Sequence, residues 1–373
     1  MKIANTGNSF RIYDSSLKIS DGLPAQSYIV RFDKNTGFFL ETYSEISINE
    51  KIYGVHSEKV DKVMKAFKLF KRNLGVILSG DKGIGKSLCA KMLASRAISD
   101  GYPLIVINGY IPGIADFLNT IEQEVVILFD EFDKTFASGA RDNMHDPQSE
   151  MLTLFDGLSM GKKMFVITCN ELGGLSNYLV NRPGRFHYHF RFDYPTSDEI
   201  CSYLKDKIGE PYYGEIDKVI AFSKKINLNY DCLRAIAFEL ALGNPFEAAI
   251  RDLNIMNISF ERYTVIAVFT DGSRMTEKRV QLDMFDDERT YAIDFEDQED
   301  YTFRAKFSTE NTIYNYDKGG VILPAASCEE AQWTEYWKDS DEEKAEVKKR
   351  NEVRKLDYLI FKKEFDKSLH YKV

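Results

Sequence analysis

The sequence predicts an α/β fold in which helices cover both faces of a parallel sheet. Four short apolar runs alternate with stretches of helical periodicity, and these runs cover residues 75–79, 104–107, 125–129 and 164–168. Such runs are typical of strands buried on both faces, and strands separated by helices are usually parallel. A helical pattern over 196–255 and a β-like pattern after 257 predict a helical lid and a C-terminal α+β domain.

The first 50 residues predict a small β element. Residues 27–31 and 37–42 have the composition of strands, and Asp-Lys-Asn-Thr-Gly at 33–37 is a turn signal between them. From about residue 57 the pattern becomes helical, because apolar side chains recur at i, i+3, i+4 and i+7. The stripe consists of Val60, Val63, Met64 and Phe67.

A glycine-rich segment follows the first apolar run and precedes a helix-like stretch at 88–99. It matches the phosphate-binding pattern GxxxxGK[ST], in which backbone N–H groups and a helix N-terminus face phosphate oxygens. We expect Lys86 to reach the β- and γ-phosphates of ATP and Ser87 to ligate Mg²⁺. The alternative is a plain glycine-rich turn before a helix. The nucleotide-binding segment comprises Gly80, Asp81, Lys82, Gly83, Ile84, Gly85, Lys86, Ser87 and Leu88.

Two acidic residues follow the third apolar run. Asp130 and Glu131 lie 44 and 45 positions after Lys86. We expect Asp130 to hold Mg²⁺ and Glu131 to polarise the attacking water. An acidic turn after a buried strand is the alternative for this pair alone. The two motifs, in this order and on separate strands, predict a P-loop NTPase that uses ATP and Mg²⁺.

Two further motifs follow the fourth apolar run. Asn170 ends that run, and residues 182–186 read Arg-Pro-Gly-Arg-Phe. Together with the phosphate-binding and acidic motifs, they resemble the AAA ATPases within the AAA+ class over about residues 50–250. The resemblance implies that Asn170 positions the water and that Arg182 and Arg185 reach the γ-phosphate held by a neighbouring subunit. A basic loop that caps a strand is the alternative for the arginine motif.

The resemblance suggests three further assignments. Ile52-Tyr53-Gly54 resembles the segment that backs the adenine ring, which would place Tyr53 and Gly54 at the nucleotide; a bend before a helix is the alternative. Tyr110 is either a substrate-gripping pore residue or a loop aromatic. Arg234 is either a second nucleotide sensor on the lid or a solvated helix residue.

The motifs define four segments. Residues 1–50 are the N-terminal β-like element, 51–194 the AAA+ nucleotide-binding domain, 195–256 the helical lid, and 257–373 a C-terminal β-rich/α interaction domain. The resemblance implies an ATPase that forms a hexamer-like ring and remodels or assembles a protein partner. A DNA-directed ATPase and a nucleotide-gated scaffold are the alternatives. The termini and the compact core also resemble AAA proteins encoded by large tailed phages.

The region after the fourth run carries several local signals. Thr-Ser-Asp-Glu at 196–199 fits a capping box at the start of a helix. Residues 340–367 predict a charged helix. The stretch 283–300 holds nine acids against one base, which predicts a solvated face or a partner site. His187 and His189 alternate on a strand without a third ligand nearby, so we expect surface or core histidines instead of a metal site.

Composition limits the classes of function and the setting. The net charge is −9 and the pI is near 5.3, so binding of nucleic acid is possible but not favoured. Five widely spaced cysteines predict reduced thiols. The chain has neither an apolar signal core nor a run long enough to span a membrane. We therefore expect a soluble, cytoplasmic protein, in the host cytoplasm if it is viral.

Overall fold

A computed structural model describes residues 1–5, 10–43, 53, 56–137, 146–156, 161–170, 172–176, 178–180, 182–255, 261–286, 288–315, 318, 320–334 and 340–364. The chain divides into two compact units, Met1–Asp193 and Tyr194–Val373.

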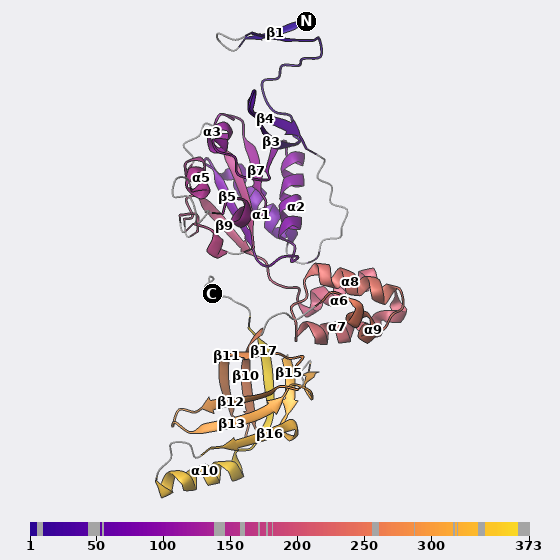
Figure 1. Ribbon diagram of the computed structural model, residues 1–373, viewed down its shortest axis with the longest axis vertical. Coiled ribbons are helices and arrows are strands. Elements are labelled where there is room, and N and C mark those ends of the chain that lie inside the picture. Colours follow the sequence, from indigo (N-terminus) through magenta and orange to yellow (C-terminus); the bar gives the residue numbers. More distant parts are fainter. Residues whose placement is uncertain are drawn as a thin grey trace. The chain divides into compact units, whose positions relative to one another are not determined.

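A mixed sheet forms the centre of the first unit (Figure 1). In the described part of the chain it has seven strands in the order β4-β3-β6-β7-β8-β5-β9, and only β3 and β4 pair antiparallel. The strands are β3 (Ser27–Asp33), β4 (Gly37–Thr42), β5 (Leu74–Ser79), β6 (Leu104–Ile107), β7 (Val125–Phe129), β8 (Lys163–Cys169) and β9 (Phe186–Arg191). The expected α/β fold with a parallel sheet is confirmed.

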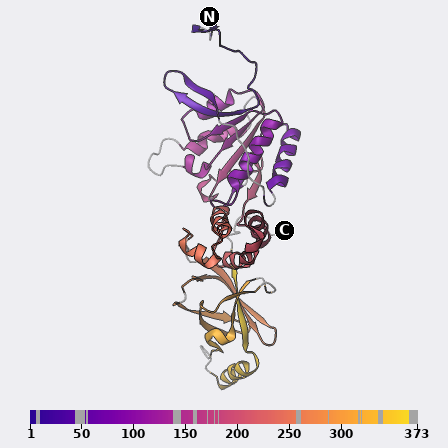
Figure 2. The ribbon, with the colours of Figure 1, turned by 90° about the vertical axis from the view of Figure 1, so that its right-hand side faces the viewer.

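The hairpin of β3 and β4 extends this sheet at one edge (Figure 2). Strand β3 pairs in parallel with β6, with Ser27 opposite Leu104, and β4 is the outermost strand. The sequence predicts both strands but not that they join the central sheet. A second hairpin, β1 (Lys2–Asn5) with β2 (Phe10–Tyr13), forms a separate two-stranded sheet.

Helices cover both faces of the central sheet (Figure 1). Helices α1 (His56–Leu69) and α2 (Lys86–Ser99) lie together on one face. The opposite face carries α3 (Ile114–Asn119), the short α4 (Phe132–Thr135) and α5 (Pro147–Phe155). The predicted stripe of α1 is confirmed, since all four of its apolar residues are buried.

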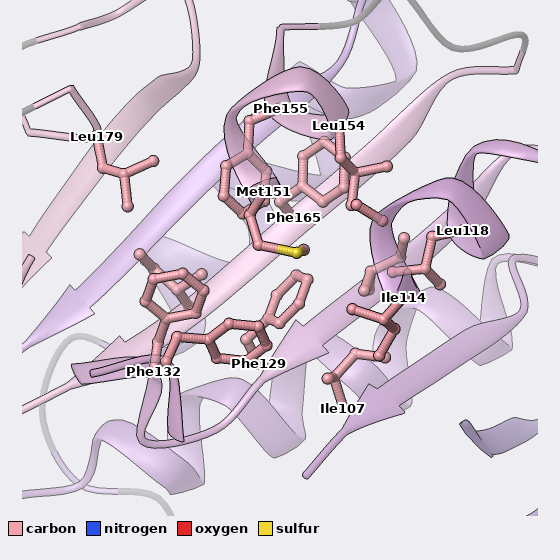
Figure 3. Packing of buried hydrophobic residues seen from close by; sticks show 14 of the residues in the cluster. Ile107, Ile114, Leu118, Phe129, Phe132, Met151, Leu154, Phe155, Phe165 and Leu179 are labelled. Atoms are coloured by element: carbon pink, nitrogen blue, oxygen red, sulfur yellow. The ribbon is translucent and has the colours of Figure 1, made fainter. Parts of the chain in front are cut away.

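Aromatic and aliphatic side chains pack together in the core beneath α3, α4 and α5 (Figure 3). Phe129 of β7 contacts Phe132 and Phe155 edge-on, and Phe155 in turn contacts Phe165 of β8. Burial of such a ring contributes about 1.5–3 kcal/mol. This core therefore fixes α4, the short helix that directly follows the acidic motif, against the sheet.

Four α-helices open the second unit: α6 (Ser197–Lys207), α7 (Ile216–Ser223), α8 (Tyr230–Ala241) and α9 (Phe246–Asp252). The predicted capping box is confirmed. The Thr196 hydroxyl accepts from the Glu199 backbone N–H at 3.3 Å, and the Thr196 N–H donates to the Glu199 carboxylate at 2.8 Å.

Antiparallel sheets and an α-helix complete the described part of the second unit. One sheet has the order β11-β10-β17-β15-β14 and the other β12-β13-β16, and both contribute to a single core. The elements are β10 (Glu261–Phe269), β11 (Arg274–Leu282), β12 (Thr290–Glu296), β13 (Thr302–Ser308), β14 (Ile313–Asn315), β15 (Gly320–Pro324), β16 (Cys328–Trp333), α10 (Asp341–Val353) and β17 (Leu356–Lys363).

The charged helix expected over 340–367 is wrong beyond Val353. Leu356–Lys363 forms β17, which lies between β10 and β15. Its Leu359, Ile360 and Phe361 are buried, and a strand places such side chains on both faces of a sheet. The many charged residues of α10 made the whole segment look like one charged helix, so the short apolar run after it was not recognised as a strand.

Part of the acidic stretch is paired within the second unit. The Arg350 guanidinium of α10 contacts Asp297 and Glu299 and lies over the Tyr301 ring at 4.0 Å. Arg304 similarly holds Asp294 at 2.6 Å. These acids therefore contribute to the structure of the unit itself.

All five cysteines are free in this structure. Within the described residues, no helix combines the length and the apolar character that a bilayer span requires.

Candidate functional site

The glycine-rich loop joins the carboxyl end of β5 to the N-terminus of α2. Lys86, the first residue of α2, is buried, and its ammonium donates to the carbonyls of Gly80 and Asp81 at 2.6 Å each. A third bond reaches Asn170 Oδ1 at 2.9 Å. Burial lowers the pKa of Lys86, while nearby acids such as Asp81 and Asp133 oppose that shift. The loop is thus closed around one buried positive charge.

Two glycines of this loop have no room for a side chain. Gly80 has φ 139°, and a Cβ there would lie 2.4 Å from the Phe192 carbonyl oxygen. Gly85 has φ 98°, and a Cβ there would lie 2.7 Å from His56 Nε2. Positive φ and close backbone approach are the conditions that favour glycine. His56, at the start of α1, was not singled out from the sequence.

Asp130 and Glu131 follow β7 and are anchored to the neighbouring strand β8. The Thr168 hydroxyl donates to Asp130 Oδ1 at 2.6 Å, and the Glu131 backbone N–H donates to the same hydroxyl at 2.8 Å. Glu131 adopts the left-handed conformation with φ 48° and ψ 49°. The threonine therefore fixes the turn that carries both carboxylates.

The Glu131 side chain forms an ion pair with a residue of the short helix that follows it. Lys134 Nζ donates to Glu131 Oε1 at 2.7 Å. This hydrogen bond is the main cause that lowers the pKa of Glu131, and partial burial opposes it. The carboxylate is consequently ionised at neutral pH, as a base that polarises water requires.

Asn170 lies at the carboxyl end of β8, between the strands that lead to the loop and to the acidic pair. Its side chain accepts from Lys86, and its backbone N–H donates to Asp133 Oδ2 at 2.9 Å. Asp133 and Thr168 are thus structural members of the site. Their positions in the sequence, two residues after Glu131 and two before Asn170, could have drawn attention to them. The sequence does not show the hydrogen bonds that they form.

The chemistry of this sheet edge fits a Mg²⁺–nucleotide. Ser87 and Asp130 are both exposed and supply a hydroxyl and a carboxylate, which are oxygen ligands that Mg²⁺ prefers. The open α2 N-terminus and the positive-φ glycines suit phosphate. Among the other loop residues, Asp81 and Lys82 are exposed, Gly83 and Leu88 are half-buried, and Ile84 is buried.

The segment expected to back the adenine ring is described only at Tyr53. Its carbonyl oxygen lies 2.9 Å from His56 Nδ1, which places it next to the start of α1. Gly54 lies outside the described residues.

The two arginines of the Arg-Pro-Gly-Arg motif lie in different environments. Arg185 is buried and binds both carboxylate oxygens of Asp156, and it also donates to the Tyr178 carbonyl at 2.8 Å. Arg182 is exposed, and its guanidinium lies over the Tyr178 ring at 5.6 Å. Within a single chain, Arg185 therefore braces its own loop and Arg182 faces outward.

Three other residues considered from the sequence make contacts within their own units. Tyr110 is partly buried against the aromatic core, edge-on to Phe136, and burial together with Glu150 raises its pKa to about 12. Arg234 is exposed and pairs with Asp231 at 3.6 Å. His189 lies 2.7 Å from the Ser79 hydroxyl.

One comparison with known proteins found a family model that matches part of the chain. The family model described as "ATPase family associated with various cellular activities (AAA)" matches residues 76–194, the segment that contains the loop, the acidic pair, Asn170 and both arginines. The search of curated proteins found no match.

Proposed function

We propose that the chain is an AAA-type ATPase that hydrolyses ATP with Mg²⁺ and works as a ring-like oligomer that remodels or assembles a protein partner, and the match of residues 76–194 to the AAA family model supports this proposal. The observation that carries the proposal is the convergence of three strand ends. The phosphate-binding loop, the acidic pair and Asn170 follow adjacent strands, and the Lys86–Asn170 bond joins two of them. Open α/β sheets bind ligands at this edge.

Each residue of the site then has one task. Lys86 contacts the β- and γ-phosphates, and the backbone of the loop surrounds them. Ser87 and Asp130 hold Mg²⁺, which neutralises charge on the phosphate oxygens. Glu131 accepts a hydrogen bond from the attacking water, and Asn170 orients that water.

The arginine motif supports a site that two subunits complete. Arg182 is exposed, so it is the residue that we assign to the γ-phosphate of a neighbouring subunit. Arg185 differs from the expectation that both arginines act there, because its pairing with Asp156 satisfies its guanidinium inside its own chain. We assign it the task of holding the loop so that Arg182 faces outward.

Remodelling of a protein is the proposed use of the hydrolysis energy. Its support is the match to the AAA family model together with the strands β10–β17 of the second unit, which contain none of the site residues. We propose 257–373 as the partner-binding part.

Two substitutions test the chemistry. Lys86→Ala removes the charge from the phosphates and is expected to abolish ATP binding, measured with a fluorescent ATP analogue. Glu131→Gln leaves the phosphate contacts and is expected to bind ATP without turnover. Lys65→Ala, at an exposed position of α1, is the control and keeps both properties. Near wild-type turnover in Glu131→Gln would show that another group acts on the water.

A further inference from the structure

The turn that carries Glu131 fixes the backbone of this residue. The residue is left-handed although it is not a glycine, a conformation that is unfavourable for a residue with a side chain. Its N–H is fixed by Thr168, and its carbonyl accepts from the N–H groups of Lys134 and Thr135 at 2.9 Å each. The backbone is therefore held on both sides, and only side-chain rotation can change where the carboxylate lies.

That carboxylate pairs with Lys134, three residues further along, and it also hydrogen-bonds to the Asn170 side chain. Glu131 Oε1 and Lys134 Nζ are 2.7 Å apart, and the two side chains are 46% and 53% exposed. Glu131 directly precedes α4 and Lys134 lies within it, so this short turn places the ammonium beside the carboxylate. An oxygen that accepts from an ammonium is a weaker acceptor for the proton of a water molecule.

We infer that Lys134 is a positioning residue that restrains Glu131, so that the ion pair must open before the carboxylate can polarise water. This inference rests on the proposed role of Glu131 in hydrolysis. Because both side chains are about half exposed, the pair is weak, and it slows turnover without blocking it.

The expected effect follows from the strength of such pairs. Exposed pairs are typically worth 0.2–1 kcal/mol. Loss of the ammonium is therefore expected to raise kcat about two- to fivefold, which corresponds to about 0.4–1 kcal/mol of barrier. The KM for ATP is expected to stay unchanged, because Lys134 is not among the residues assigned to the phosphates.

The experiment compares steady-state ATPase activity of full-length variants. Lys134→Met keeps the length of the side chain and removes its charge, and Lys134→Gln is a second neutral variant. Lys134→Arg restores a cation and is expected to return kcat toward wild type. The matched control is Lys65→Met, at an exposed position of α1, which is expected to change neither kcat nor KM.

The outcomes separate this inference from the proposed function. If Glu131→Gln is inactive and Lys134→Met raises kcat as described, the inference is supported, and the double variant stays inactive. If Glu131→Gln is inactive but both neutral Lys134 variants leave kcat unchanged or lower it, the inference alone is overturned. A rise that Lys65→Met shares also overturns it. Turnover in Glu131→Gln overturns both the inference and the proposed role of the base.

Discussion

Removal of either partner of the Arg185–Asp156 pair is expected to destabilise the first unit by different amounts. The Arg185 side chain is 10% exposed, whereas that of Asp156 is 41% exposed. In Asp156→Ala the guanidinium stays buried and keeps only its bond to the Tyr178 carbonyl. In Arg185→Met the aliphatic packing is kept, and water can reach the carboxylate that remains.

The magnitudes follow from this asymmetry. A buried charge that loses its partner costs about 3–5 kcal/mol, and the partial exposure of this pair reduces that to roughly 2–3 kcal/mol for Asp156→Ala. For Arg185→Met we expect about 1 kcal/mol, since the group left behind is hydrated. Turnover is expected to fall in both variants, because both release the loop that carries Arg182.

The assay is urea unfolding followed by circular dichroism, with hydrogen exchange measured over the peptides that contain residues 178–192. Tryptophan fluorescence reports on the second unit, because both tryptophans lie after residue 332, and it serves as the internal control. An equal or reversed order of the two destabilisations would refute the reasoning from burial. Full turnover in Asp156→Ala would instead refute the role of the pair in holding the loop.

Three smaller predictions concern packing and charge. Tyr110→Ala is expected to lower the free energy of unfolding by roughly 2–3 kcal/mol, and Tyr110→Phe by much less, as measured by thermal unfolding. If Tyr110 were instead a pore residue, Tyr110→Ala would impair remodelling of the partner without lowering stability. Thr196→Ala removes the capping box and is expected to cost about 1 kcal/mol; faster hydrogen exchange at the start of α6 is the readout, and an unchanged rate would contradict it. Arg350→Met is expected to cost roughly 3 kcal/mol in the second unit, followed by tryptophan fluorescence. Burial raises the pKa of Asp297, but hydrogen bonds from the Tyr301 N–H and from Arg350 outweigh burial and lower it. The stability that the Arg350–Asp297 pair contributes is therefore present above about pH 4 and is lost as the pH falls. Acid unfolding of Arg350→Met at the same pH as wild type would contradict this prediction.

The buried strands of the central sheet could be predicted because each is a short continuous run of apolar residues. The apolar stretches at 104–107 and 125–129 coincide with β6 and β7. The position of β3 beside β6 could not be predicted from the sequence, because pairing between distant segments leaves no local periodicity. The same applies to β17, where eight residues follow a charged helix and pair with strands on both sides.

The candidate site shows the same division. Spacing and residue type suffice to select Lys86, Asp130 and Glu131, because phosphate and Mg²⁺ chemistry restricts those positions. The Thr168 bonds that fix the acidic turn depend on strand order, which sequence spacing does not encode. The different burial of Arg182 and Arg185 depends on Asp156, a partner 29 residues away from Arg185.

The measurement that tests the central claim most directly mixes two inactive variants. Lys86→Ala lacks nucleotide but keeps Arg182, and Arg182→Ala binds ATP but lacks the outward arginine, a group whose contribution to rate is roughly 10³–10⁵. In a random equal mixture, roughly a quarter of the interfaces in a ring would join an occupied site to an intact arginine. We predict that ATPase activity returns at intermediate ratios, with co-assembly verified by capture of a tagged variant. Mixed assemblies whose turnover stays at background at every ratio would contradict a site shared between subunits.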